Sequence, residues 1–349
     1  MSCSVRITAG IEFADHIHLC DTSAGTQPDV DEGGYRMTSK LPKFVATSVV
    51  RGSQQGKSHG GVFTVDFEHQ EVAQQVDWNT SDIDFTGRGA DRGLRGIAFN
   101  GDEILIAASD ELFRYDRSFK IKTSSRNLYL KHCHEVCRFQ QMLFLTSTGF
   151  DSLLALDLEK MKFTWGFHLQ RRYDQWAGFP FDPRSGMGPR PVNNYHINMV
   201  YVDETGIYLS GLRTQSLLHL DGNLEISEIC SLPAGAHNAR PYREGVLFND
   251  TSADCVRYVG RDGESIAFHV PTYDERDIEF KGIDDSSIAR QGFGRGLCPV
   301  GDRFVAAGSS PSTISLYDFD NRQKVGSVNL TMDIRNAIHG LELWPYDDY

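Results

Sequence analysis

Four histidines and two arginines open six repeated segments of this chain. Each segment continues with a short apolar-alternating stretch, a Gly/Asp/Glu turn and a second apolar stretch. The six opening residues are Arg95, His134, His196, His237, Arg295 and His339. Imidazole nitrogens bind first-row transition metals or move protons, and guanidinium groups hold carboxylate, sulfate or phosphate through paired hydrogen bonds. If the six segments fold alike, these side chains meet and form one site.

The spacing of the opening residues predicts the fold. They lie 39, 62, 41, 58 and 44 residues apart, which fits a unit of about 40 residues with two insertions of about 20. Several units continue into a third and a fourth apolar strand, as in DELFRYDRS followed by FKIKTSS. Four short antiparallel strands with frequent turns make one blade of a β-propeller. The sequence therefore predicts an all-β protein, a six-bladed β-propeller.

The sixth unit is incomplete at its C-terminal end. After His339 only one strand fits before the sequence ends at Tyr349, and its missing strands are expected from KFVATSVV, GGVFTVDF and EVAQQVDW, which follow residue 42. The two ends of the chain would then share one blade and close the ring, which leaves no open sheet edge. Residues 43–349 are predicted to form the propeller. Residues 1–42 fit no blade and are expected to form a peripheral or partly disordered arm.

The opening residues are expected at one mouth of the central channel, because the first strand of each propeller blade lines that channel. The three consecutive histidines could hold a divalent transition metal (Fe, Mn, Zn or Cu), with His339 as a fourth ligand or as an acid–base catalyst. Arginine repels a cation, so Arg95 and Arg295 are expected to hold an anionic group of the substrate. These two arginines and His339 are the candidate catalytic residues. The candidate metal ligands are His134, His196, His237 and His339.

Neighbouring residues are expected to support this site. Histidines that bind metal usually donate their second ring nitrogen to a partner that fixes the tautomer, and the candidates for this role are Glu135, Asn194, Asn198 and Asn238. The long connections 79–93, 171–193 and 272–294 each precede a first strand, which places them on the face that carries the opening residues. The second connection is expected to supply a substrate rim of Arg171, Arg172, Tyr173 and Trp176.

Three functions are compatible with this layout. The first is an enzyme of lyase or oxygenase type that uses a histidine-bound metal on a small anionic organic substrate. The second is a metal-free site in which an imidazole is the nucleophile or general base and guanidinium groups stabilise the developing charge. The third is a non-catalytic interaction scaffold, in which the opening residues only bond neighbouring backbone and plug the channel.

Composition excludes several classes of partner. The net charge of −12 argues against binding to nucleic acid or to an acidic membrane surface, because a phosphate-backbone binder needs a basic face. The sequence contains no apolar run of membrane-spanning length, and the start MSCSVRITAG is not that of a signal peptide. Seven cysteines without regular spacing are typical of reduced thiols. The protein is therefore expected to be cytoplasmic.

The blade openings also resemble a known group of proteins. The segments HNARPYREGVLFND, YHINMVYVDETGIYLSG and GRGLCPVGDRFVAAG are similar to those of uncharacterised bacterial conserved-hypothetical proteins that carry a domain of unknown function. The resemblance covers about residues 90–345 and implies a six-bladed propeller without an established reaction. The segment RGIAFNGDEILIAASDELFRYD is similar to the NHL and gluconolactonase-like repeat, which is a statement about fold alone.

Two further resemblances concern the layout of the site. Arylsulfate sulfotransferases are six-bladed propellers with histidine and arginine around the channel, and they resemble the metal-free alternative. Propeller lyases and the carotenoid oxygenases place histidines around a metal at the channel mouth, and they resemble the metal-dependent alternative. Both are analogies of architecture, and they imply a reaction class only as an expectation.

Overall fold

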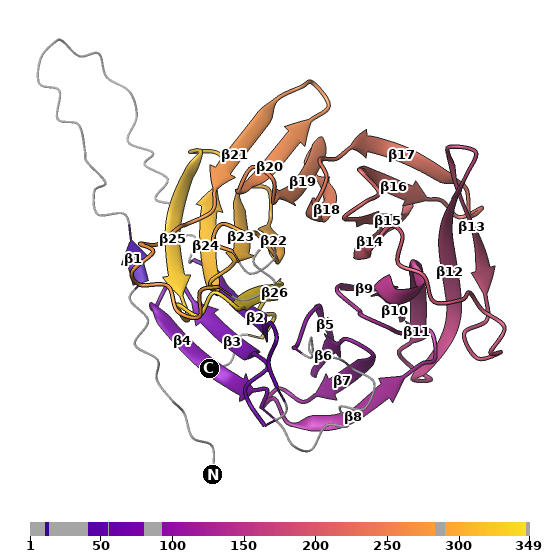
Figure 1. Ribbon diagram of the computed structural model, residues 1–349, viewed down its shortest axis with the longest axis horizontal. Helices are drawn as coiled ribbons and strands as arrows, with labels where there is room; N and C mark the ends of the chain where they lie inside the picture. Colours follow the sequence, from indigo (N-terminus) through magenta and orange to yellow (C-terminus); the bar gives the residue numbers. More distant parts are fainter. Residues whose placement is uncertain (1–10, 14–40, 55, 80–92, 283–289, 347–349) are drawn as a thin grey trace, which may run out of the picture.

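The computed structural model describes residues 11–13, 41–54, 56–79, 93–282 and 290–346. Within these ranges six antiparallel sheets of four or five strands surround a central axis (Figure 1). The predicted six-bladed β-propeller is confirmed. The only helical element of the described residues is a single 3-10 turn, Thr148–Phe150, and no helix there is long and apolar enough to cross a membrane.

The first five blades follow one another along the chain, each from its innermost strand outward. The first contains β5 (Ile97–Asn100), β6 (Glu103–Ala108), β7 (Glu111–Tyr115) and β8 (Ile121–Arg126). The second contains β9 (Val136–Phe139), β10 (Met142–Ser147), β11 (Ser152–Asp157), β12 (Lys162–Arg172) and β13 (Gln175–Phe181). The third contains β14 (Ile197–Asp203), β15 (Gly206–Gly211), β16 (Ser216–Leu220) and β17 (Ile226–Ser231). The fourth contains β18 (His237–Tyr242), β19 (Gly245–Asp250), β20 (Cys255–Gly260) and β21 (Ser265–His269), and the fifth β22 (Leu297–Val300), β23 (Phe304–Ser309), β24 (Thr313–Asp318) and β25 (Gln323–Asn329).

The sixth blade is shared by the two ends of the chain, as predicted. Its innermost strand is the C-terminal β26 (Asn336–Leu343), and its other strands are β2 (Lys43–Val50), β3 (Gly61–Asp66) and β4 (Glu71–Asp77). Strands β2 and β26 pair antiparallel, from Phe44 opposite Leu343 to Val50 opposite Asn336. This pairing closes the ring with backbone hydrogen bonds, so no sheet edge is left open at the junction.

Part of the predicted N-terminal arm belongs to the propeller. Residues 11–13 form β1 (Ile11–Phe13), which pairs with β25 and adds a fifth, outermost strand to the fifth blade. Residues 1–10 and 14–40 of the predicted arm lie outside the described residues. The arm therefore stays a prediction.

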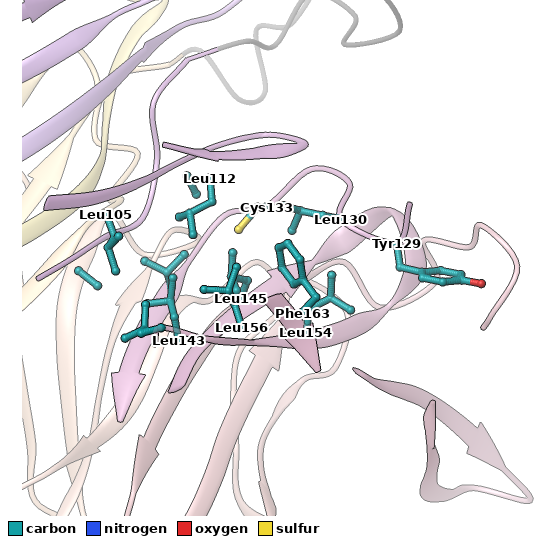
Figure 2. Packing of buried hydrophobic residues seen from close by; sticks show 14 of the residues in the cluster. Leu105, Leu112, Tyr129, Leu130, Cys133, Leu143, Leu145, Leu154, Leu156 and Phe163 are labelled. Atoms are coloured by element: carbon teal, nitrogen blue, oxygen red, sulfur yellow. The ribbon is translucent and has the colours of Figure 1, made fainter. Parts of the chain in front are cut away.

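Neighbouring blades pack through apolar side chains. The cluster in Figure 2 lies between the first two blades and includes Leu105 and Leu112 of the first and Leu143, Leu145 and Leu156 of the second, all fully buried. Middle strands are covered on both faces and are apolar almost throughout, whereas the outermost strand β8 is mostly exposed. Each buried leucine contributes about 1.5–3 kcal/mol. Because these contacts between blades hold the ring together, the channel itself does not need an apolar lining and can carry polar residues.

Candidate functional site

The opening residues come together at the centre of the ring, where the six innermost strands meet (Figure 1). The His134 ring lies 5.1 Å from the His196 ring and 6.2 Å from the His339 ring, centroid to centroid. Arg295 Nη1 lies 2.8 Å from His339 Nε2. We call this set the upper ring; its members are Arg95, His134, His196, His237, Arg295 and His339. All six are buried or half-buried.

Glycines allow the innermost strands to approach closely. Gly96 follows an arginine of the upper ring, and a Cβ atom there would lie 2.6 Å from the backbone nitrogen of Val136 in the next blade. A Cβ on Gly340 would lie 2.3 Å from the carbonyl oxygen of Arg95. Any side chain at these positions would therefore push two blades apart. The Gly96 N–H donates to the His134 carbonyl at 3.1 Å, which fixes two neighbouring members of the ring relative to each other.

The third blade departs from the repeat. In the first, second, fourth and fifth blades the opening residue lies five positions before the last residue of the innermost strand. In the third blade His196 lies seven positions before Asp203, and a β-bulge between Ile197 and Met199 accounts for one of the two extra residues. The strand register of His196 therefore differs from that of the openings in these four blades. By strand register the equivalent residue is Asn198.

A buried aspartate that the sequence analysis missed holds His196 in place. His196 has a positive φ of 56°, which is uncommon for a residue with a side chain. The Asp151 carboxylate accepts hydrogen bonds from the backbone N–H groups of Asn194, Tyr195 and His196, at 2.5, 3.1 and 3.0 Å. Burial raises the pKa of Asp151, and these three N–H groups oppose the rise. The signal in the sequence is one carboxylate, in TGFDSL, among apolar and small residues.

Backbone carbonyls fix the tautomer of two imidazoles. His134 Nδ1 lies 2.8 Å from the carbonyl oxygen of His132 and 2.9 Å from Thr148 Oγ1. His237 Nδ1 lies 2.8 Å from the carbonyl oxygen of Gly235. A carbonyl oxygen only accepts, so Nδ1 of each ring carries the proton and donates it. The Nε2 atoms of both rings are therefore left as acceptors of a proton or a hydrogen bond.

A direct contact between His339 and Arg295 fixes the third tautomer. A guanidinium has no acceptor, so Arg295 Nη1 donates and His339 Nε2 accepts. The Arg295 guanidinium also lies 4.8 Å from the centre of the Phe293 ring. The His237 ring packs against the same phenylalanine, with 5.4 Å between ring centroids. Phe293 thus orients one arginine and one histidine of the upper ring.

Burial and neighbouring guanidinium groups keep the imidazoles neutral. Burial is the main cause that lowers the pKa of His134, His237 and His339 well below the usual 6.5 and that of His196 to about 3. The positive charge of Arg295 contributes to all four shifts. At neutral pH the histidines therefore carry no charge, and the charge within the upper ring belongs to its arginines.

Arg51 is a further cation that the sequence analysis missed. It directly follows β2 and is buried. Its charge lowers the pKa of both His237 and His339. Its position after an outer strand, rather than at a blade opening, explains why the repeat pattern gave no signal for it.

Three of the predicted metal ligands, His134, His196 and His339, have rings close to one another. In the described part of the chain no group of three or more His, Cys, Asp or Glu side chains is arranged to hold a metal ion. His339 gives its Nε2 lone pair to Arg295, and a guanidinium in contact with a ligand repels a cation. The divalent metal stays a prediction that elemental analysis can test.

None of the four predicted supporting residues contacts an imidazole of the upper ring through a side-chain hydrogen bond in the described part of the chain. Glu135 accepts hydrogen bonds from the Val136 backbone and from Asn238 Nδ2, each at 3.1 Å. Asn194 is exposed. Asn198 is buried, and neither atom of its amide has a hydrogen-bond partner among the described residues.

The predicted substrate rim is a hairpin rather than a loop. Strand β12 pairs with β11 only as far as His168, and its last residues pair with β13 alone, so the hairpin extends past the sheet on the side where innermost strands begin. Arg171 lies 5.2 Å above the Trp176 ring, which packs 5.1 Å from the ring of Tyr195, next to His196. Tyr173 at the tip is fully exposed and Arg172 is exposed. Residues 80–92 and 283–289 of the other two connections lie outside the described residues.

Replacing Asn198 by leucine is expected to raise stability and lower ligand affinity. A buried amide without partners costs about 1–3 kcal/mol, so Asn198→Leu should raise the free energy of unfolding by about that amount. If the amide serves a ligand, the variant should also bind sulfate about tenfold less tightly. Urea unfolding and calorimetry measure the two effects. The exposed Asn194→Leu is the control, and a loss of stability in Asn198→Leu would show that the amide has a structural partner.

Comparisons with known proteins extend the fold assignment only. No family model and no curated protein matches the sequence. A chain in a crystal structure of a nidogen/laminin complex is 9% identical, with a TM-score of 0.53, covering 86% of this chain and 98% of that one. A protein of unknown function from Bacteroides caccae is 11% identical, with a TM-score of 0.53 and coverage of 88% and 100%. A streptogramin B lyase structure is 12% identical over 65% and 69%, with a TM-score of 0.39. The first two share the propeller fold with this chain, and the NHL and gluconolactonase-like detail stays a prediction.

Proposed function

We propose that the upper ring binds a small organic anion and moves a proton to or from it. The observation that carries this proposal is the contact of Arg295 with His339 inside a cluster of neutral imidazoles. A guanidinium forms paired, charge-assisted hydrogen bonds with a carboxylate, sulfate or phosphate. His134 and His237 offer Nε2 acceptors in the same cluster. The proposal thus corresponds to the metal-free alternative among the three predicted functions.

The groups have complementary roles in such a reaction. The arginines would hold the anionic group and stabilise negative charge that develops next to it. An imidazole Nε2 would accept a proton from the substrate and return it to the leaving or product group. His196 has no side-chain hydrogen bond among the described residues, so both of its ring nitrogens can bond a substrate. This chemistry covers eliminations, isomerisations and group transfers on an anionic organic molecule.

Binding of sulfate and malonate, measured by isothermal titration calorimetry, tests the proposal. The protein should bind at least one of the two, and Arg295→Gln should weaken that binding by about 30-fold or more. The double variant with Arg95→Gln should abolish it. Arg276→Gln removes an exposed guanidinium and is the matched control, with unchanged affinity. Affinity that survives in the double variant would overturn the proposal.

Elemental analysis of the same preparation distinguishes the metal-dependent alternative from the proposed metal-free site. One equivalent of a transition metal per chain that disappears in His134→Ala and His196→Ala would favour the histidine-bound metal. Ring variants that leave sulfate, malonate and metal content all unchanged would favour the interaction scaffold.

A further inference from the structure

A polar cavity lies in the central channel, beyond the upper ring. It has a volume of about 410 Å³, in the range typical of small-molecule sites. Its lining comes from the innermost strands, and it begins one to three residues further along each strand than the upper ring does. We call it the lower chamber. The ionisable and aromatic residues that matter for its chemistry are Glu135, Tyr201, Arg240 and Glu342.

The charges of the lower chamber are separated across the channel. The innermost strands follow the order β5, β9, β14, β18, β22 and β26 around the ring, so β18 lies opposite β5 (Figure 1). Glu135 directly precedes β9 and Glu342 lies on β26, so the two residues come from the strands on either side of β5, and the Glu135 carboxyl reaches far enough to accept from Asn238 of β18. β5 contributes the small Ala98 between them. Arg240 lies on β18, opposite this acidic side.

The opposite charges are not paired with each other. The Arg240 guanidinium lies 4.4 Å above the Tyr201 ring, and its Nε is buried without a hydrogen-bond partner among the described residues. In the same set of residues, the one hydrogen-bond donor to the Glu342 carboxyl is the Cys298 thiol, at 4.0 Å. Buried charges in proteins are normally paired or hydrogen-bonded. Two unpaired charges that face one cavity indicate that its occupant supplies the partners.

The titration of the two carboxyl groups agrees with a place for a cation between them. Burial raises the pKa of Glu135 to about 8 and that of Glu342 to about 7. The neighbouring Glu342 adds to the rise at Glu135, and the Arg240 charge opposes the rise at both. A positive group between the carboxyl groups would stabilise their ionised forms.

We propose that the lower chamber binds a small zwitterion, with its ammonium group between Glu135 and Glu342 and its carboxylate on Arg240. A molecule with one charge satisfies only one side of the chamber and leaves the half-buried charge on the other side without a partner. The chamber therefore discriminates against simple anions and simple cations. This site differs from the upper ring, where the fixed charges are guanidinium groups.

The test uses three zwitterions, glycine, 4-aminobutanoate and 6-aminohexanoate. Each is compared by isothermal titration calorimetry at pH 7.5 with the carboxylate and the amine of the same chain length. One zwitterion should bind about tenfold or more tightly than both of its singly charged counterparts. Arg240→Gln and Glu342→Gln should each weaken this binding about tenfold or more, and Arg240→Lys, which keeps the charge, should weaken it less.

Controls separate this site from the upper ring. Arg276→Gln removes an exposed guanidinium that does not line the chamber and should change zwitterion affinity less than threefold. Arg240→Gln should leave sulfate and malonate binding unchanged, whereas Arg295→Gln should leave zwitterion binding unchanged. The proposal is overturned if no zwitterion binds, if singly charged molecules bind equally well, or if binding survives in both Arg240→Gln and Glu342→Gln.

Discussion

The free energy of unfolding is expected to be greatest near pH 6.5 and to fall on both sides. On the acid side the cause is the four histidines of the upper ring, whose pKa values are lower in the folded protein than the usual 6.5. Below pH 6.5 the unfolded chain binds protons that the folded protein rejects. Each such proton costs about 1.4 kcal/mol per pH unit, and the loss continues down toward the folded pKa, which is about 3 for His196.

The alkaline side has the opposite sign and a different cause. Glu135 and Glu342 have folded pKa values of about 8 and about 7, above the usual 4.5. The folded protein therefore keeps protons that the unfolded chain releases, and this contribution to stability is lost as pH rises from 4.5 to about 8. Between pH 5 and pH 6 the protons that the four histidines take up on unfolding outnumber those that the two carboxyl groups release, so stability rises with pH. Above about pH 7 the carboxyl groups dominate, and stability falls as pH rises.

Urea unfolding between pH 4.5 and pH 8.5 measures both limbs. Below pH 6.5, His237→Gln should reduce the number of protons taken up on unfolding, and so the slope of the free energy of unfolding against pH, by about one proton. The control is His69→Gln, at an exposed histidine. Glu135→Gln combined with Glu342→Gln should flatten the alkaline limb. A pH profile that is the same in the wild type and in these variants would contradict the assignment of the buried protons.

Loss of the Asp151 carboxylate is expected to be the most damaging single change near the site. Asp151→Ala removes the acceptor of three partly buried backbone N–H groups. The free energy of unfolding should fall by about 3–5 kcal/mol. The exposed Asp182→Ala removes a local turn acceptor and should change stability by less than about 0.5 kcal/mol.

Asp151 is expected to act on the site as a positioning residue. The isosteric Asp151→Asn keeps the size of the side chain but replaces one acceptor oxygen by a donor, which opposes the N–H groups of the turn at His196. Sulfate or malonate affinity at the upper ring should therefore fall in the folded Asp151→Asn protein, while zwitterion binding in the lower chamber stays unchanged. Equal losses at both sites would indicate a general structural defect instead.

Much of the fold could be predicted from the sequence because propeller blades are local structures. Hairpins such as that of β5 and β6 depend on alternation and turn residues within about 40 residues. The ring closure by β2 and β26 was predictable because an incomplete last unit needs strands from elsewhere. Strand β13 (Gln175–Phe181), the second strand of the hairpin with β12, was missed because its Gly and Pro residues are typical of a loop.

The candidate site was predicted in part. The repeat predicted that Arg295 and His339 lie at one mouth of the channel, and in the structure the two side chains are in direct contact. Asn198 could not be assigned its position, because a bulge shifts strand register without leaving a fixed sequence pattern. Arg240 and Glu342 were ionisable residues within apolar first strands, HNARPY and IHGLEL, and this signal could have indicated the lower chamber.

The sequence by itself determined the number of blades, the closure of the ring and the residues that open the blades, because periodic burial acts over short stretches of chain. Only the tertiary structure decided which atoms face each other. The His339 lone pair is committed to Arg295, and Glu342 lies across the channel from Arg240 without touching it. Such contacts join residues from different blades, and their distances depend on how six sheets pack around one axis. Charge, burial and hydrogen bonding act over a few ångströms, so this packing decides the chemistry of the channel.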